Sequence, residues 1–108
     1  METSKTAQEV AKTIAKQLGG NRFNAMVGAY NHACGTDDKG NDFYSVRFRG
    51  SRKANYVKIT LNVMDLYDLE FGKVSKKGYK PFANIVANIY FCDLQKTFTE
   101  VTGLNTSL

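Results

Sequence analysis

The chain has little of several residue types on which enzyme chemistry commonly depends. Its 108 residues include no tryptophan, one proline, one histidine and two cysteines. His32 has no serine or cysteine nucleophile motif beside it, which argues against a hydrolytic triad. Cys34 and Cys92 lie far apart without metal-ligand spacing, so we expect two buried thiols in a reducing compartment. We predict no catalytic residue, no cofactor and no enzymatic activity.

Long apolar runs are also missing. No stretch approaches the roughly 20 apolar residues that a membrane span needs, and the polar opening METSKTAQEV has no secretory signal core. We therefore expect a cytoplasmic protein without a membrane partner. With 43% hydrophobic residues the chain is long enough for one compact core, so residues 1–108 are predicted to form a single domain.

Two segments have the 3.6-residue period of amphipathic helices. In the first, apolar residues recur from Ala7 to Leu18, and the glycine pair at 19–20 ends the pattern. The second is predicted from about Asn84 to Gly103, where apolar residues stand at helical spacing: Val86, Ile89, Tyr90, Leu94, Phe98 and Val101. Each helix has one apolar stripe, so each needs an apolar surface to cover.

Between these helices the period changes to two, which is typical of half-buried strands. We predict three strands, over 23–27 continuing to about Ala33, 44–48 and 57–61. A fourth strand is predicted at 67–71 after a short turn at 62–65, with a helical turn as the alternative, and residues 73–80 should form a loop. The fold class is therefore α+β: an antiparallel meander of three to four strands with N- and C-terminal helices packed on one face.

Strand alternation divides the side chains of this predicted sheet into two faces. The face toward the helices is expected to consist of Phe23, Ala25, Val27, Tyr44, Val46, Phe48, Val57, Ile59 and Leu61. The opposite face, which we call the open face, then has Arg47, Arg49, Tyr56, Lys58 and Thr60, with Asn24, Met26 and Phe43 as further candidates. From Phe43 to Met64 the chain has five basic residues and no acidic one, so the open face is expected to be cationic.

Cationic and aromatic side chains on one sheet face are typical of proteins that bind single-stranded nucleic acid without strong sequence preference. The cations attract phosphates, and the exposed rings stack on bases. The predicted nucleic-acid-binding residues are Arg47, Arg49, Arg52, Lys53, Tyr56 and Lys58, and the track is extended by Lys73, Lys76, Lys77 and Lys80. Edge lysines also discourage strand aggregation, so a solvated face without a ligand is an open alternative.

Acidic residues offer a second kind of candidate site. Asp65, Asp68 and Glu70 fall within six residues and have the oxygen ligands that Mg²⁺ prefers. However, Glu70 and Lys73 would lie on opposite faces of a strand, unlike the Asp/Glu-x-Lys pattern of metal-dependent nucleases. We therefore predict no metal site.

Protein interaction is the alternative function. A sheet with one open face and exposed edge strands is a natural surface for binding another protein. In that case the chain would modulate a host protein or form a homodimer, and it would have no nucleic-acid role.

Three blocks stand in order along the chain: LGGNRFNAMVGA, NYVKITLNVMDLYDLEFGKV and TEVTGLNTSL. They resemble a family of small proteins that tailed phages and related mobile elements encode, and the resemblance extends over about half of the chain. The segments YNHACGTDDKGNDFYS and SKKGYKPFANI lie outside it. The resemblance implies a setting, the host cytoplasm during infection, and no catalytic mechanism. Partners expected there are single-stranded DNA or RNA and host proteins.

Overall fold

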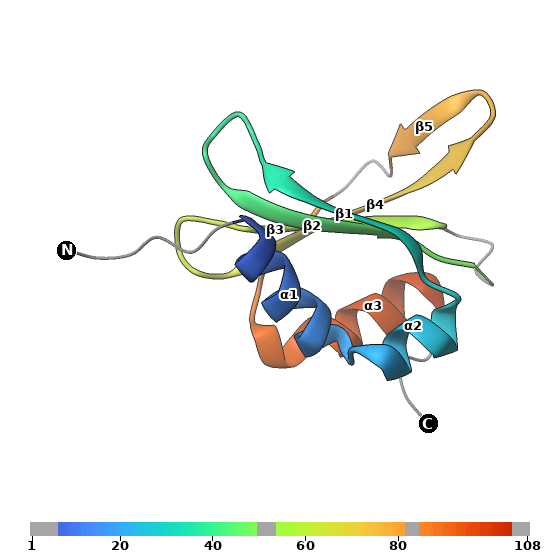
Figure 1. Ribbon diagram of the computed structural model, residues 1–108, viewed down its shortest axis with the longest axis horizontal. Helices are drawn as coiled ribbons and strands as arrows, with labels where there is room; N and C mark the ends of the chain where they lie inside the picture. Colours follow the sequence, from blue (N-terminus) through green and yellow to red (C-terminus); the bar gives the residue numbers. More distant parts are fainter. Residues whose placement is uncertain (1–6, 50–53, 82–84, 105–108) are drawn as a thin grey trace.

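The computed structural model describes residues 7–49, 54–81 and 85–104, which form a curled sheet with helices on one side (Figure 1). In chain order the elements are α1 (Ala7–Leu18), α2 (Asn21–Val27), β1 (Tyr30–Thr36), β2 (Asp42–Arg47), β3 (Tyr56–Leu61), β4 (Tyr67–Ser75), β5 (Gly78–Pro81), β6 (Val86–Ile89), the 3₁₀ helix η1 (Phe91–Asp93) and α3 (Leu94–Thr102). The α+β class, the antiparallel meander and the packing of both terminal helices on one face are confirmed. The described residues form six strands, more than predicted.

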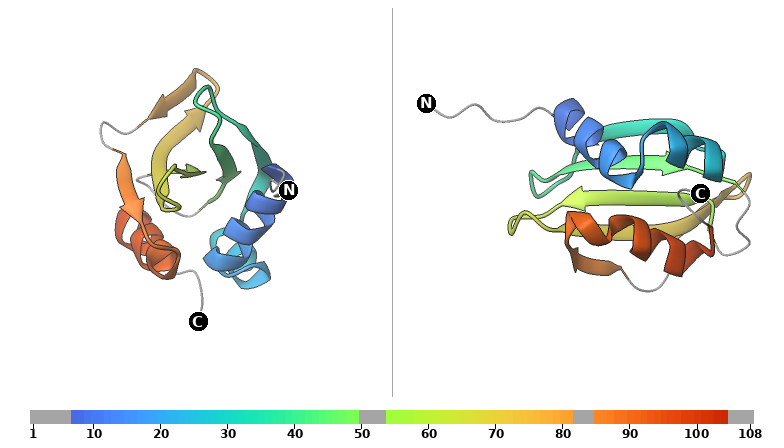
Figure 2. Two further views of the ribbon diagram at one scale, coloured as in Figure 1. Left: turned by 90° about the vertical axis from the view of Figure 1, so that its left-hand side faces the viewer. Right: turned by 90° about the horizontal axis from the view of Figure 1, so that it is seen from below.

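Strands that follow one another in the chain are neighbours in the sheet from β1 to β5. The outer side of β4 is shared between two partners, because its Gly72–Ser75 end pairs with β5 and its Tyr67–Leu69 end pairs with β6. The sheet curls away from the helices, so its open face is concave (Figure 2). None of the described helices is long and apolar enough to cross a membrane.

The core lies between the inner face of the sheet and the three helices. Strand alternation directs the predicted residues of β2, β3 and β4 inward, and α1 contributes Val10, Ile14 and Leu18. Phe98 of α3 is fully buried at the centre. Its ring centroid lies 5.0 Å from that of Phe23, 5.0 Å from that of Phe48 and 6.1 Å from that of Phe71. These rings join α2, α3 and the sheet in one cluster.

The predicted first strand is wrong over 23–27, because Asn21–Val27 forms α2, whereas its continuation to about Ala33 overlaps β1. Phe23 and Val27 are buried, whereas Ala25 is exposed. A separation of four residues fits one turn of a helix as well as two repeats of a strand, so these two apolar positions are compatible with either. The helix ends at Gly28, whose left-handed φ of 62° suits glycine. Asn24 and Met26 therefore lie on a helix and not on the open face.

Three other predictions also need correction. Residues 73–80 are the end of β4 and most of β5, which pair as a hairpin instead of a loop. The helix expected from Asn84 begins only at Leu94, after β6 and η1. Cys34 and Cys92, which we expected to be buried, are both exposed, because they lie in an edge strand and in η1.

Candidate nucleic-acid interface

The open face is built from rows of residues that lie opposite one another on neighbouring strands. Opposed residues of an antiparallel pair point to the same face. The first row is Tyr30, Arg47, Tyr56 and Gly72; the second is Ala33, Ser45, Lys58 and Glu70; the third is Gly35, Phe43, Thr60 and Asp68. The first row lies at one end of the strands and the third at the other end, so the two ends differ in charge.

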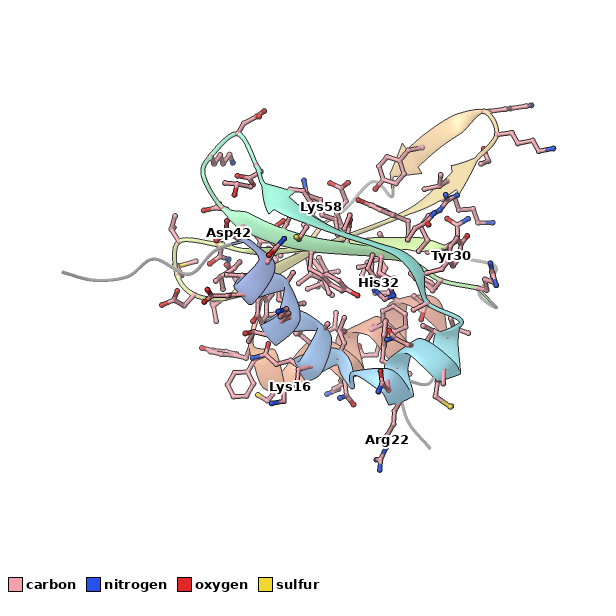
Figure 3. All side chains as sticks on the ribbon, in the orientation of Figure 1. Lys16, Arg22, Tyr30, His32, Asp42 and Lys58 are labelled. Atoms are coloured by element: carbon pink, nitrogen blue, oxygen red, sulfur yellow. The ribbon has the colours of Figure 1, made fainter. Side chains whose placement is uncertain are left out.

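The end with the first row combines cations and aromatic rings. The guanidinium carbon of Arg49 lies 4.3 Å from the centroid of the Tyr30 ring, and that of Arg47 lies 5.5 Å from it. These distances allow cation–π attraction. The backbone N–H of Arg49 donates to the carbonyl oxygen of Val27 at 2.8 Å, so the end of α2 positions this arginine. Figure 3 labels Tyr30 at this end of the sheet.

Tyr56 and Tyr79 continue this surface toward β5. Their rings meet edge to face, with centroids 5.0 Å apart. The Tyr79 hydroxyl donates to Oε2 of Glu70 at 2.8 Å, and burial together with this carboxylate raises the pKa of Tyr79. We call Tyr30, Arg47, Arg49, Tyr56 and Tyr79 the aromatic–cationic end. Nε of Arg47 is buried and has no hydrogen-bond partner in the described part of the chain.

The opposite end of the open face contains carboxylates. Lys58 lies opposite Glu70, and its Nζ lies 4.5 Å from the centroid of the Phe43 ring. A groove of about 280 Å³ opens here, lined by Asp37, Asp38, Lys39, Asn41, Lys58, Thr60, Asp68, Glu70 and Ile85. We call Asp37, Asp38 and Asp68 the acidic end, whereas Glu70 lies in the middle row between the two ends. The open face is therefore not uniformly cationic, because β4 and the β1–β2 turn add carboxylates to it.

The predicted binding residues are brought together only in part. Arg47, Arg49 and Tyr56 meet at the aromatic–cationic end, whereas Lys58 lies one row away beside Glu70. Arg52 and Lys53 lie outside the described residues. Of the predicted turn GSRKAN, only Ala54 and Asn55 are described. Lys73, Lys76 and Lys77 are exposed along the β4–β5 hairpin.

Sequence reasoning missed Tyr30 and Tyr79. Tyr30 falls in the predicted continuation of the first strand to about Ala33 but was not assigned to the open face, and Tyr79 falls in the predicted loop 73–80, because YNHACGT and GYKP have little apolar alternation. Tyr79 has lysines close to it in the sequence, whereas Tyr30 has no Lys or Arg within seven residues and so gives no such signal. The pairing of β1 with β2 and of β4 with β5 brings them to the open face.

The three carboxylates considered for Mg²⁺ do not form one cluster. Asp68 and Glu70 face the groove on the open face, while Asp65 lies in the turn after β3 and lines a separate cavity of about 210 Å³ beside α1. Within 7–49, 54–81 and 85–104, no three His, Cys, Asp or Glu residues are grouped so that they could hold a metal ion.

Comparisons of the chain with protein-family models, with curated proteins and with solved structures give no match. The chemistry of the open face is therefore the basis for inferring a function. Its distinguishing property is the concentration of rings and guanidinium groups at one end.

Proposed function

We propose that the protein binds single-stranded nucleic acid, without strong sequence preference, at the aromatic–cationic end of the open face. The observation that supports this most is the pair of guanidinium groups over Tyr30, at 4.3 and 5.5 Å. Arg47 lies between Tyr30 and Tyr56 in the same row. Rings that stack on bases and cations that attract phosphates are thus neighbours, which is the combination that sequence-tolerant binders use.

The acidic end sets the path of the bound strand. Carboxylates at Asp37, Asp38 and Asp68 repel phosphates, so a strand cannot follow the full length of the open face. It instead crosses the β-strands from Tyr30 toward Tyr79, beyond which the exposed Lys76 and Lys77 of the β4–β5 turn add positive charge. Such a short path accommodates about four nucleotides, the low end of the range for single-strand binders.

Charge neutralisation at the two arginines tests this proposal. Each phosphate contact releases condensed counterions, so affinity should fall with salt by a log–log slope of roughly −0.7 per contact. Arg47→Gln with Arg49→Gln should weaken binding and flatten this slope. Fluorescence anisotropy with labelled oligonucleotides at two salt concentrations measures both. Lys12→Gln with Lys16→Gln is the matched control, because it removes the same charge from exposed positions of α1.

Stacking can be separated from charge at Tyr56. Tyr56→Ala should weaken binding by about 1–3 kcal/mol and leave the salt slope unchanged, since no cation is lost. The absence of binding at low salt would contradict the proposal. An equal loss of oligonucleotide affinity in the double arginine variant and in the α1 lysine control would also contradict the proposal, because binding would then depend on net charge alone.

A protein-interaction module is the second candidate, and exposed apolar side chains favour it. Val63 is 88% exposed, Tyr90 61% and Phe91 62%, and Phe91 lines the cavity beside α1. No residue of the aromatic–cationic end lines this cavity. A pull-down of host proteins, with and without nuclease treatment, tests this function. It is favoured if a bound protein remains after nuclease treatment and is lost with Phe91→Ser but not with the Arg47→Gln, Arg49→Gln variant. Retention that nuclease abolishes would favour nucleic-acid binding.

A further inference from the structure

β1 is an edge strand whose middle is uncovered on both faces. Among the described residues no strand lies beyond it, so alternate backbone N–H and C=O groups have no ladder partner. Ala33, opposite Ser45, points to the open face, and Cys34, opposite Tyr44, points to the helix side; both are exposed. A bare edge of this kind pairs readily with another strand.

The part of this edge from Ala33 to Thr36 lacks the features that normally prevent such pairing, because the irregularity of β1 lies before Ala33. None of the seven residues of β1 is charged or proline. By contrast β5, at the opposite edge, has only four residues and includes Lys80 and Pro81, which are residue types that protect edges. The register irregularity in β1 lies between Tyr30 and Ala33, so the pairing from Ala33 to Thr36 is regular. β1 is therefore the edge suited to pairing.

Charge at the two ends of β1 identifies the partner. At its start, Arg47 and Arg49 lie over Tyr30. At its end, the segment 37–42 has three carboxylates against one lysine. In an antiparallel pair of identical strands, the start of each strand lies beside the end of the other, so cations meet carboxylates at both ends. We propose that β1 pairs antiparallel with β1 of a second copy of this chain, around a twofold axis at Cys34.

The register of this pair follows from the axis. Within the regular part of β1, Ala33 of one copy, one residue before Cys34, lies opposite Gly35 of the other copy, one residue after it. The two Cys34 residues face each other with Cα atoms about 4.5–5.5 Å apart. A twofold axis perpendicular to the sheet leaves both open faces on the same side and uncovered. The dimer and the proposed nucleic-acid site share Arg47 and Arg49, because carboxylates of the second copy lie beside these guanidinium groups. A crosslink at Cys34 involves neither arginine, so it tests the dimer separately.

Cysteine crosslinking and solution mass test the register on nucleic-acid-free protein. Cα atoms about 4.4–6.8 Å apart can be joined by a disulfide. Added diamide, which accepts the two electrons and two protons of the thiols, should convert the Cys92→Ser protein to a covalent dimer. Cys34→Ser should lose this crosslink while light scattering still reports the mass of a dimer. A monomeric wild type, or a dimer without the Cys34 crosslink, would overturn the proposal.

Charge variants test the complementarity. Cys34→Lys places two ammonium groups opposite each other and should give a monomer, whereas Gln8→Lys at an exposed position of α1 should remain dimeric. Asp38→Lys and Arg49→Glu should each raise the dimer Kd about tenfold, and the double variant should restore it. Circular dichroism checks that each variant is folded. A double variant as weak as the single ones would contradict the antiparallel pairing, whatever the result with oligonucleotides.

Discussion

At the scale of single residues, Tyr44 connects the core to the edge strand. Its side chain is only 4% exposed, and its hydroxyl is hydrogen-bonded to Nδ1 of the exposed His32 on β1. Burial raises the pKa of Tyr44 from 10.0 to about 12. The only histidine of the chain is thus a structural partner of a phenol.

This shift gives a pH dependence of stability. Because the folded state holds the Tyr44 proton more tightly, the stabilisation is fully present below pH 10 and is lost as the pH rises toward 12. Tyr44→Phe should therefore reduce the difference between the urea midpoints at pH 8 and pH 11. An unchanged difference would mean that the Tyr44 phenol does not contribute to the alkaline loss.

At the scale of elements, asparagines fix both ends of β3. Nδ2 of Asn55 donates to the carbonyl oxygen of Val74 at 2.9 Å, and its Oδ1 accepts from the Val74 N–H at 2.7 Å. At the other end, Oδ1 of Asn62 accepts from the N–H groups of Met64 and Leu66. Nδ2 of Asn62 donates to Asp68 and Asn88. One side chain thus links the turn to β4 and β6.

Removal of the Asn62 side chain should therefore loosen three segments together. We expect Asn62→Ala to lower the free energy of unfolding by about 1–3 kcal/mol, because several polar groups lose their partner. Urea denaturation followed by circular dichroism measures this. Gln8→Ala, at an exposed position of α1, should change stability by less than about 0.5 kcal/mol. Equal effects of the two substitutions would show that the Asn62 hydrogen bonds contribute little.

The elements that the sequence predicted are those with an unambiguous period. α1, β2 and β3 each repeat their apolar positions often enough to exclude the other period. Phe23 and Val27 in α2 do not exclude a strand, because a spacing of four residues fits the period of a helix and that of a strand. β5 and β6 form through backbone pairing with β4; Tyr79 of β5 is exposed and no side chain of β6 is fully buried, so composition could not reveal these strands.

The candidate site was predictable to a similar extent. Alternation placed Arg47, Arg49 and Tyr56 on one face, because these residues belong to the strands with clear periods. Alternation along the predicted strand 67–71 directs Asp68 and Glu70 to the face away from Leu69 and Phe71, but the position of Glu70 opposite Lys58 depends on the register of β3 and β4. Strand register is a property of pairing, which one sequence segment alone does not specify.

At the scale of the whole molecule, stability depends on the aromatic cluster around Phe98. This residue is fully buried and contacts rings from α2, from the end of β2 and from β4. Phe98→Ala should lower the free energy of unfolding by about 3–5 kcal/mol, and Phe98→Leu by less, because a smaller cavity remains. Thermal unfolding followed by near-ultraviolet circular dichroism measures both. A similar decrease in the free energy of unfolding in the two variants would indicate that ring contacts contribute more than cavity volume.

The position of Phe98 in α3 also has a consequence for biosynthesis. The ribosome makes α1, α2 and β1 to β4 before α3. Phe23, Phe48 and Phe71 therefore lack contact with Phe98 while the nascent chain is being extended. Native packing requires contacts between residues about 75 positions apart in the chain, which slows folding relative to local contacts. Until α3 has left the exit tunnel, the part of the inner sheet surface that Phe98 covers is consequently accessible to chaperones.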